Sequence, residues 1–174
     1  MSEAVKTRGR NQSGAFFNES GDELMNNYET IMVDGVCSEC GNSQHDGLSC
    51  YEQFGYPLAW EHDDPELYEV HFWLVSCYMI QHPSVFTEEG YRHLIELFVE
   101  AYDQDWNAAY TLKKNRELIK KISKITNPVS SQNRVRERKD WVMTIGDIYV
   151  DGKANAMMNI KKWKDCVRNE VKNR

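Results

Sequence analysis

Apolar side chains recur at helical spacing along most of the chain beyond residue 50. The clearest series runs from Leu67 to Gln81, where the residues at positions i, i+3, i+4 and i+7 form one face of a helix. Asp64 followed by Pro65 is typical of a helix start, and Pro83 is typical of a helix end. The pattern therefore predicts a helix over 64–81 with one buried stripe.

Similar patterns predict further helices over about 50–61, 87–102, 107–124 and 154–171, and Thr144 with Asp147 caps a short one before the last. Pro57 predicts a kink or an early end in the first of these, and Asp151-Gly152 predicts a turn. The amphipathic segment 22–33 fits helix and strand equally. The fold class is therefore expected to be all-α, a compact helical domain of about five helices.

The polar residues at the N-terminus and the apolar content of the rest set the domain organisation. Residues 1–21, with Gly, Ser and Asn, are typical of a disordered tail, and 22–174 are expected to form a single helical domain. Segment 126–140 contains Asn127-Pro128 and several arginines, and it predicts an exposed basic loop. No apolar run approaches the roughly 18 residues that span a membrane, and no signal peptide is recognisable. We therefore expect a cytoplasmic protein.

Charge is divided unevenly between the two parts of the chain. The net charge is −16 up to Trp106 and +10 from Asn107 onward, within a total of −6. Such a division favours packing between the acidic and the basic part, either within one chain or between two copies, because their opposite charges attract. It also permits a nucleic-acid partner, a weaker interpretation, for the basic residues Lys113, Lys114, Lys120, Lys121, Arg134, Arg136, Arg138 and Lys139.

Candidate chemistry is concentrated in the fourteen residues from Cys37 to Cys50. Cys37, Cys40, His45 and Cys50 follow the spacing C-x2-C-x4-H-x4-C, with a glycine directly after the second cysteine. A Cys-x-x-Cys pair brings two thiolates to one ion, and tetrahedral sulfur and nitrogen donors suit zinc. Because cytoplasmic thiols stay reduced, a metal site is favoured over disulfides. The domain is thus expected to begin with a zinc-binding loop.

The remaining cysteines and the loop's charges refine this prediction. Cys77 and Cys166 lie inside apolar helical patterns and are expected to be small buried hydrophobic residues. His45 completes the spacing of a zinc knuckle, a module that often binds RNA. Glu39 and Asp46, however, stand where such a knuckle carries positive charge. Three thiolates also quench the Lewis acidity of the ion, which favours a structural over a catalytic site.

Several segments share motifs with one known family of bacterial proteins. The run from Val70 to Pro83 is similar to an H-x-L-T-V-x-x-Y-x-x-Q-H-P signature, and the cysteines at 37, 40 and 50 match a C-x-x-C and a later Cys. Thr144 to Ile148, with Trp163 and Val167, is similar to the C-terminal elements of the same family. The chain thus resembles the family of unknown function DUF5946. Many members carry Asp where this chain has Ser76, and a His in the last helix where this chain has Ala156 and its neighbours.

The resemblance points to His71 or His82 as the fourth metal ligand in place of His45. If the helices after Cys50 and Asp64 form an antiparallel hairpin, His71 lies roughly 9 Å along the axis from Cys50 at 1.5 Å per residue. His82 follows the end of its helix and is freer to fold back. His45 and His82 therefore remain equal candidates, and His71 ranks behind them.

Three functions are compatible with these features. The favoured hypothesis is a zinc-stabilised helical protein that acts through an unknown protein partner or as a homo-oligomer, without catalysis. The alternative is a metal-dependent enzyme whose pocket is formed by His71, Tyr78, Gln81 and His82. Nucleic-acid binding through the basic half is a further alternative.

Overall fold

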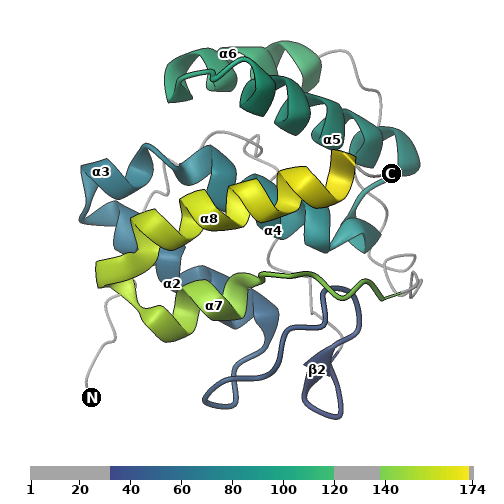
Figure 1. The fold of residues 1–174 in the computed structure, drawn as a ribbon, viewed down its shortest axis with the longest axis vertical. Helices are drawn as coiled ribbons and strands as arrows, with labels where there is room; N and C mark the ends of the chain where they lie inside the picture. The colour runs from purple at the N-terminus through teal and green to yellow at the C-terminus, as the bar shows by residue number, and fades with distance from the viewer. Residues whose placement is uncertain (1–31, 120–137, 173–174) are drawn as a thin grey trace, which may run out of the picture.

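The computed structural model describes residues 32–119 and 138–172. The expected N-terminal tail (1–21), most of the expected basic loop and the predicted end of the helix at 107–124 lie outside the described residues. Within them the chain forms seven α-helices, one short 3-10 helix and a two-stranded sheet (Figure 1). The all-α prediction is confirmed.

A small hairpin opens the described chain. Strand β1 (Met32–Val33) pairs antiparallel with β2 (Val36–Cys37). Asp34 and Gly35 between them have φ angles of 52° and 75°, as a two-residue turn with a left-handed backbone requires. The part of segment 22–33 that the structure describes is therefore a strand.

Helix α2 (Cys50–His62) begins at a complete capping box. The Ser49 side chain accepts a hydrogen bond from the Glu52 backbone N–H, and the Glu52 carboxylate accepts one from the Ser49 N–H at 2.8 Å. The helix continues through Pro57, so the early end expected there does not occur. Pro57 is buried on the same face as Phe54 and Glu61, and the packing of that face outweighs the lost backbone hydrogen bond.

The predicted helix over 64–81 is two helices, α3 (Pro65–Tyr68) and α4 (His71–Gln81). The start is as predicted, since Asp64 caps the Leu67 N–H. Val70 then leaves helical geometry, with φ of −99° and ψ of 6°, and the chain changes direction. Every residue of α4 except Trp73 is buried, so this helix lies in the core rather than burying one stripe.

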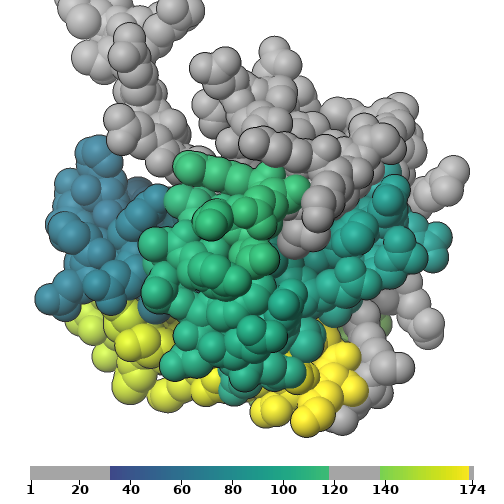
Figure 2. Space-filling model, turned by 90° about the horizontal axis from the view of Figure 1, so that it is seen from above, coloured from purple at the N-terminus to yellow at the C-terminus, as the bar shows by residue number. Residues whose placement is uncertain are grey.

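Four further helices complete the described fold: α5 (Glu88–Asp103), α6 (Ala108–Ile119), α7 (Ile145–Asp151) and α8 (Lys153–Lys172). Gly152 separates α7 from α8 with a φ of 74°, which confirms the predicted turn. Helix α8 packs on α4, with α2 and α7 on one side and α5 and α6 on the other (Figure 1). Figure 2 shows α6 lying outermost, over α5.

The core contains large side chains from α2, α4, α5 and α8, among them Phe54, Leu74, Tyr78, Phe98 and Trp163. Cys77 is fully buried in it, as predicted. Cys166 is only half-buried and borders a surface cavity, so its predicted burial is wrong. It lies on the flank of the buried stripe of α8. None of the described helices is long and apolar enough to cross a membrane.

Candidate metal centre

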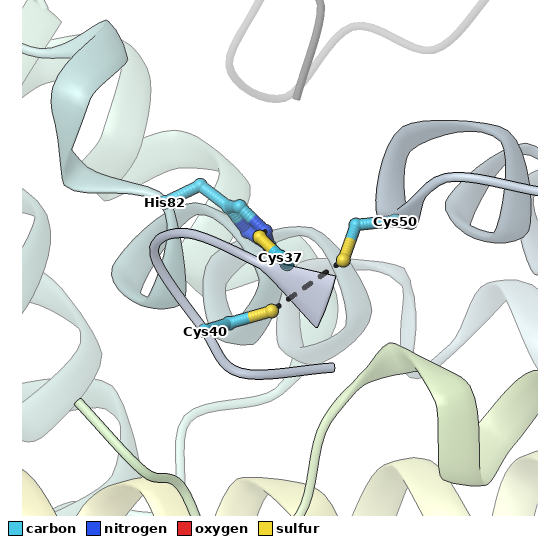
Figure 3. A group of neighbouring side chains, drawn as sticks. All are labelled: Cys37, Cys40, Cys50 and His82. Atoms are coloured by element: carbon cyan, nitrogen blue, oxygen red, sulfur yellow. Dashed lines mark hydrogen bonds between the residues drawn. The ribbon is translucent and has the colours of Figure 1, made fainter. Parts of the chain in front are cut away.

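Four side chains that can ligate a metal meet in the interior, and we call them the Cys3His cluster: Cys37, Cys40, Cys50 and His82. Their ligand atoms all lie within 4.8 Å of one another. Figure 3 shows the four side chains pointing toward a common centre. None is more than 1 % exposed. This group can hold a metal ion without contact with bulk water.

The first two cysteines reach the centre through a tight turn. Cys37 ends β2, and Gly41 donates its backbone N–H to the Cys37 carbonyl at 3.1 Å. The Cys37 N–H in turn donates to the Asn42 carbonyl at 2.8 Å. Gly41 has a φ of 73°, which explains why glycine follows the second cysteine.

The other two members come from helix termini. Cys50 is the first residue of α2, and His82 directly follows the end of α4. His82 Nδ1 donates to the Tyr78 carbonyl oxygen at 2.7 Å, which leaves Nε2 for the cluster. The imidazole also stacks on the Tyr78 ring, which stacks on Phe54, with centroids 4.1 Å apart in both pairs. The orientation of the histidine is therefore determined by the core.

The contacts within the cluster couple the protonation of its members. Cys37 Sγ lies 3.6 Å from His82 Nε2, and Cys40 Sγ lies 3.5 Å from Cys50 Sγ. Hydrogen bonds from Cys40 and Cys50, and then from His82, hold the pKa of Cys37 below its ordinary value. The same bonds to Cys37 and Cys50, together with burial, raise the pKa of Cys40. These shared hydrogen bonds thus favour the thiolate at Cys37 and the thiol at Cys40.

Buried amides form a second layer around the cluster. Asn42 Nδ2 donates to Cys50 Sγ at 3.4 Å and to Gln53 Oε1 at 2.9 Å. Gln53 Nε2 donates to the carbonyls of Ser43 and Leu48, at 3.2 and 2.9 Å, and so orders the loop before α2. Nothing in the local sequence around either amide marks it, so neither could be predicted from the sequence. Hydrogen bonds of this kind orient metal ligands.

Glu39, between the two cysteines, joins the loop to the residues after His82. Its carboxylate accepts hydrogen bonds from the Ser84 N–H at 2.9 Å and from the Ser84 hydroxyl at 3.0 Å. Ser84 belongs to the 3-10 helix η1 (Pro83–Val85). The negative charge at position 39 therefore has a structural partner within the chain.

The structure places His45 outside the Cys3His cluster, and the cluster's fourth member is His82. His45 begins a turn in which the Leu48 N–H donates to its carbonyl at 2.8 Å. Asp46 and Gly47 follow with positive φ angles. The His45 side chain lines a cavity beside α7 instead.

The other three predicted pocket residues lie along α4 and are held by different partners. His71, at the start of the helix, bonds through Nδ1 to the buried Glu61 carboxylate at 2.6 Å. Tyr78 is buried between Phe54 and His82. Gln81 Nε2 donates to the Met143 carbonyl at 2.7 Å. Ser76 and Ala156, the two departures from the family pattern, are both fully buried.

Comparison with known proteins confirms the resemblance inferred from the sequence. No curated protein and no solved structure matches the chain. The model of the family of unknown function DUF5946 matches residues 35–172, which include the Cys3His cluster and every helix from α2 to α8. The chain therefore belongs to this family.

Proposed function

We propose that the protein binds one zinc ion through the Cys3His cluster and that this ion is structural. The observation that carries the proposal is the burial of all four side chains, none more than 1 % exposed, around a common centre. A structural zinc site has four protein ligands and no open position, whereas a catalytic site keeps one for water or substrate. Three thiolates also leave the ion a poor Lewis acid.

The proposed ion would join parts of the chain that are far apart in sequence. It would tie the hairpin and the loop before α2 to the N-terminus of α2 and to the C-terminus of α4. The loop has few apolar residues of its own, so metal binding would contribute a large part of its folding free energy. Its cysteines need a reducing compartment, which supports a cytoplasmic location.

In this proposal the domain acts without catalysis, through a protein partner or as an oligomer. Exposed apolar side chains on and beside α7 support a role in association. Val142 is 79 % exposed and Val150 59 %, and Tyr56 of α2 packs edge-on against Tyr149 of α7. Light scattering over a range of concentrations tests self-association. Val150→Asp should weaken it, while Val33→Asp, an exposed site on the β1–β2 hairpin and not on α7, should not. If the protein is a monomer at all concentrations, self-association is ruled out and the proposed partner is a different protein.

The enzyme alternative draws its support from Glu61 and His71. A buried carboxylate that orients an imidazole is common in general acid–base catalysis. His71 and His82 are, however, at opposite ends of α4, so their Cα atoms are about 16 Å apart along its axis. A reaction that uses both the metal and His71 is therefore less well supported than a structural site.

Nucleic-acid binding is the least supported function. Among the basic residues that suggested it, Lys114, Arg138 and Lys139 lie within 4.0 Å of carboxylates of this chain. Lys120, Lys121, Arg134 and Arg136 lie outside the described residues. Low-salt gel retention that disappears steeply with added salt would revive this function.

Elemental analysis of the untagged protein tests the metal site directly. We expect one zinc per chain in the wild type and in His45→Ala, and loss of zinc in His82→Ala and Cys50→Ser. His45→Ala is the matched control because it removes a nearby imidazole outside the cluster. Wild-type protein without metal would overturn the proposal, as would zinc that depends on His45 and not on His82. Iron in place of zinc would correct the identity of the ion.

A further inference from the structure

We infer that Cys50 and Cys40 form an oxidative modification site, at which a peroxide converts the two thiolates to a disulfide and expels the metal. This inference rests on the proposed zinc site. It assigns the cluster a chemical sensitivity in addition to its structural role.

A surface cavity lies next to the loop that carries Cys40 and leads to Cys50. It has a volume of about 400 Å³ and lies between this loop and α7, and Gly41, Asn42 and His45 are among its lining residues. Asn42 is 4 % exposed, and its amide contacts Cys50 Sγ at 3.4 Å. One side chain therefore separates Cys50 from a space that admits a molecule as small as hydrogen peroxide. Gly41, which directly follows Cys40 in the chain, lines the same cavity.

The contacts also select the pair of cysteines. Cys40 Sγ is 3.5 Å from Cys50 Sγ and needs to approach by about 1.5 Å to reach disulfide length. Cys37 Sγ lies 3.6 Å from His82 Nε2, and it is within 4.8 Å of both other sulfurs. Cys50 Sγ is also the sulfur that contacts Asn42, which lines the cavity. Cys50 is thus the sulfur that the peroxide oxidises first, and Cys40 is the one that resolves it.

The chemistry balances with the peroxide as the sole oxidant. The Cys50 thiolate attacks one peroxide oxygen, the O–O bond breaks, and sulfenic acid and hydroxide form. The Cys40 thiolate then attacks the Cys50 sulfur, a disulfide forms, and a second hydroxide leaves. Two thiolates lose two electrons in total, and one peroxide gains them.

Disulfide formation would remove half of the coordination shell. Cys37 and His82 alone are a weak zinc site, so the ion would leave. Cys50 would also lose its charge-assisted bond with Asn42, which holds the loop to α7 through Thr144. The oxidised protein would therefore loosen at the loop and at α7, next to the exposed Val142 and Val150.

The test treats zinc-loaded wild-type protein with hydrogen peroxide and follows zinc release with a metallochromic dye. Disulfides are then mapped by mass spectrometry after free thiols are blocked. We expect one disulfide per zinc released, between Cys40 and Cys50. Asn42→Ser, which opens the path from the cavity, should release zinc several-fold faster than wild type. Val150→Ala, which changes the same cavity away from the cluster, should not.

The outcomes separate this inference from the proposed function. Protein that contains no zinc as purified would overturn both. Zinc-containing protein that resists peroxide, forms a Cys37–Cys40 bridge or oxidises to sulfinic acids would overturn the inference alone. The disulfide map of the wild type decides the question even if Asn42→Ser fails to fold.

Discussion

Thr144 donates a hydrogen bond from Oγ1 to Asn42 Oδ1 over 3.0 Å, although the two residues are 102 positions apart. The same Asn42 amide donates to Cys50 Sγ. One buried side chain therefore connects the Cys3His cluster to the first turn of α7. The Thr144 backbone N–H is itself held by the Asp147 carboxylate at 2.7 Å, so the cap of α7 and the cluster belong to one network.

Thr144→Val should destabilise the fold by about 1–2 kcal/mol, since it leaves the buried Asn42 oxygen without its donor. Thr144→Ser keeps the hydroxyl and should lose much less. Denaturant unfolding of zinc-loaded protein measures both variants. Equal stability of Thr144→Val and wild type would mean that this bond does not hold α7 to the loop.

Gly146→Ala should cost about 1–3 kcal/mol by overpacking. A Cβ at this position would lie 2.1 Å from Asn42 Oδ1 and 3.2 Å from His45 Nε2, so the network beside the cluster must shift. Gly55→Ala is the matched control, because a Cβ there meets nothing within 4 Å. That exposed helical site should gain up to about 1 kcal/mol. Thermal unfolding compares the two, and a neutral Gly146→Ala would contradict the close approach.

Removal of zinc by a strong chelator should loosen the molecule unevenly. Residues 32–49 contribute only Met32, Cys37 and Cys40 to the hydrophobic core, so their amides should exchange with deuterium much faster in the metal-free protein. Amides of α5, which packs on α4 and α8 away from the cluster, should change little. Exchange measured by mass spectrometry tests this contrast. Equal acceleration in both regions would mean that the ion stabilises the whole domain cooperatively.

Glu61 should make stability depend on pH. Burial raises the pKa of this carboxyl, and His71 opposes the shift only in part. A raised pKa in the folded protein means that the folded state holds the proton more tightly than the unfolded chain. The stability that this group contributes is therefore present below the ordinary glutamate pKa of about 4.3, and it is lost as the pH rises through the pKa of the folded state. Glu61→Gln should remove that loss while its amide oxygen still accepts from His71 Nδ1.

Unfolding curves of wild type and Glu61→Gln over a series of pH values measure the effect. The stability difference should shift in favour of Glu61→Gln as pH rises. His93→Gln is a control, because it removes a half-buried histidine whose carboxylate neighbours, Glu89 and Glu96, are exposed. A difference that is constant with pH would show that Glu61 has the same pKa in the folded and unfolded chain.

Some features of this protein follow from short stretches of sequence alone. Helix starts at Cys50 and Asp64, and the turn at Gly152, depend on capping groups and backbone angles of neighbouring residues. The turn that brings Cys37 and Cys40 together is equally local. These could be predicted because each interaction spans only a few residues.

The break at Val70 and the passage of α2 through Pro57 could not be predicted in this way. The local sequence favours a continuous helix at Val70 and an interrupted one at Pro57. In both cases the burial of a helix face outweighs that preference. The prediction for Cys166 failed for a related reason, since apolar spacing places a residue near a buried stripe without saying how far the neighbouring helix extends over it.

The sequence by itself determined an all-helical domain, the membership of a family and three cysteines spaced for a metal. Only the tertiary structure decided that His82 rather than His45 completes the Cys3His cluster, and that Asn42 and Gln53 support it. The physical reason is that the spacing of residues in a loop indicates only which ligands that loop contains. The position of the fourth ligand, His82, depends on how α4 packs against α2. That packing depends on Phe54, Tyr78 and His82 stacking across the core, which no local pattern encodes.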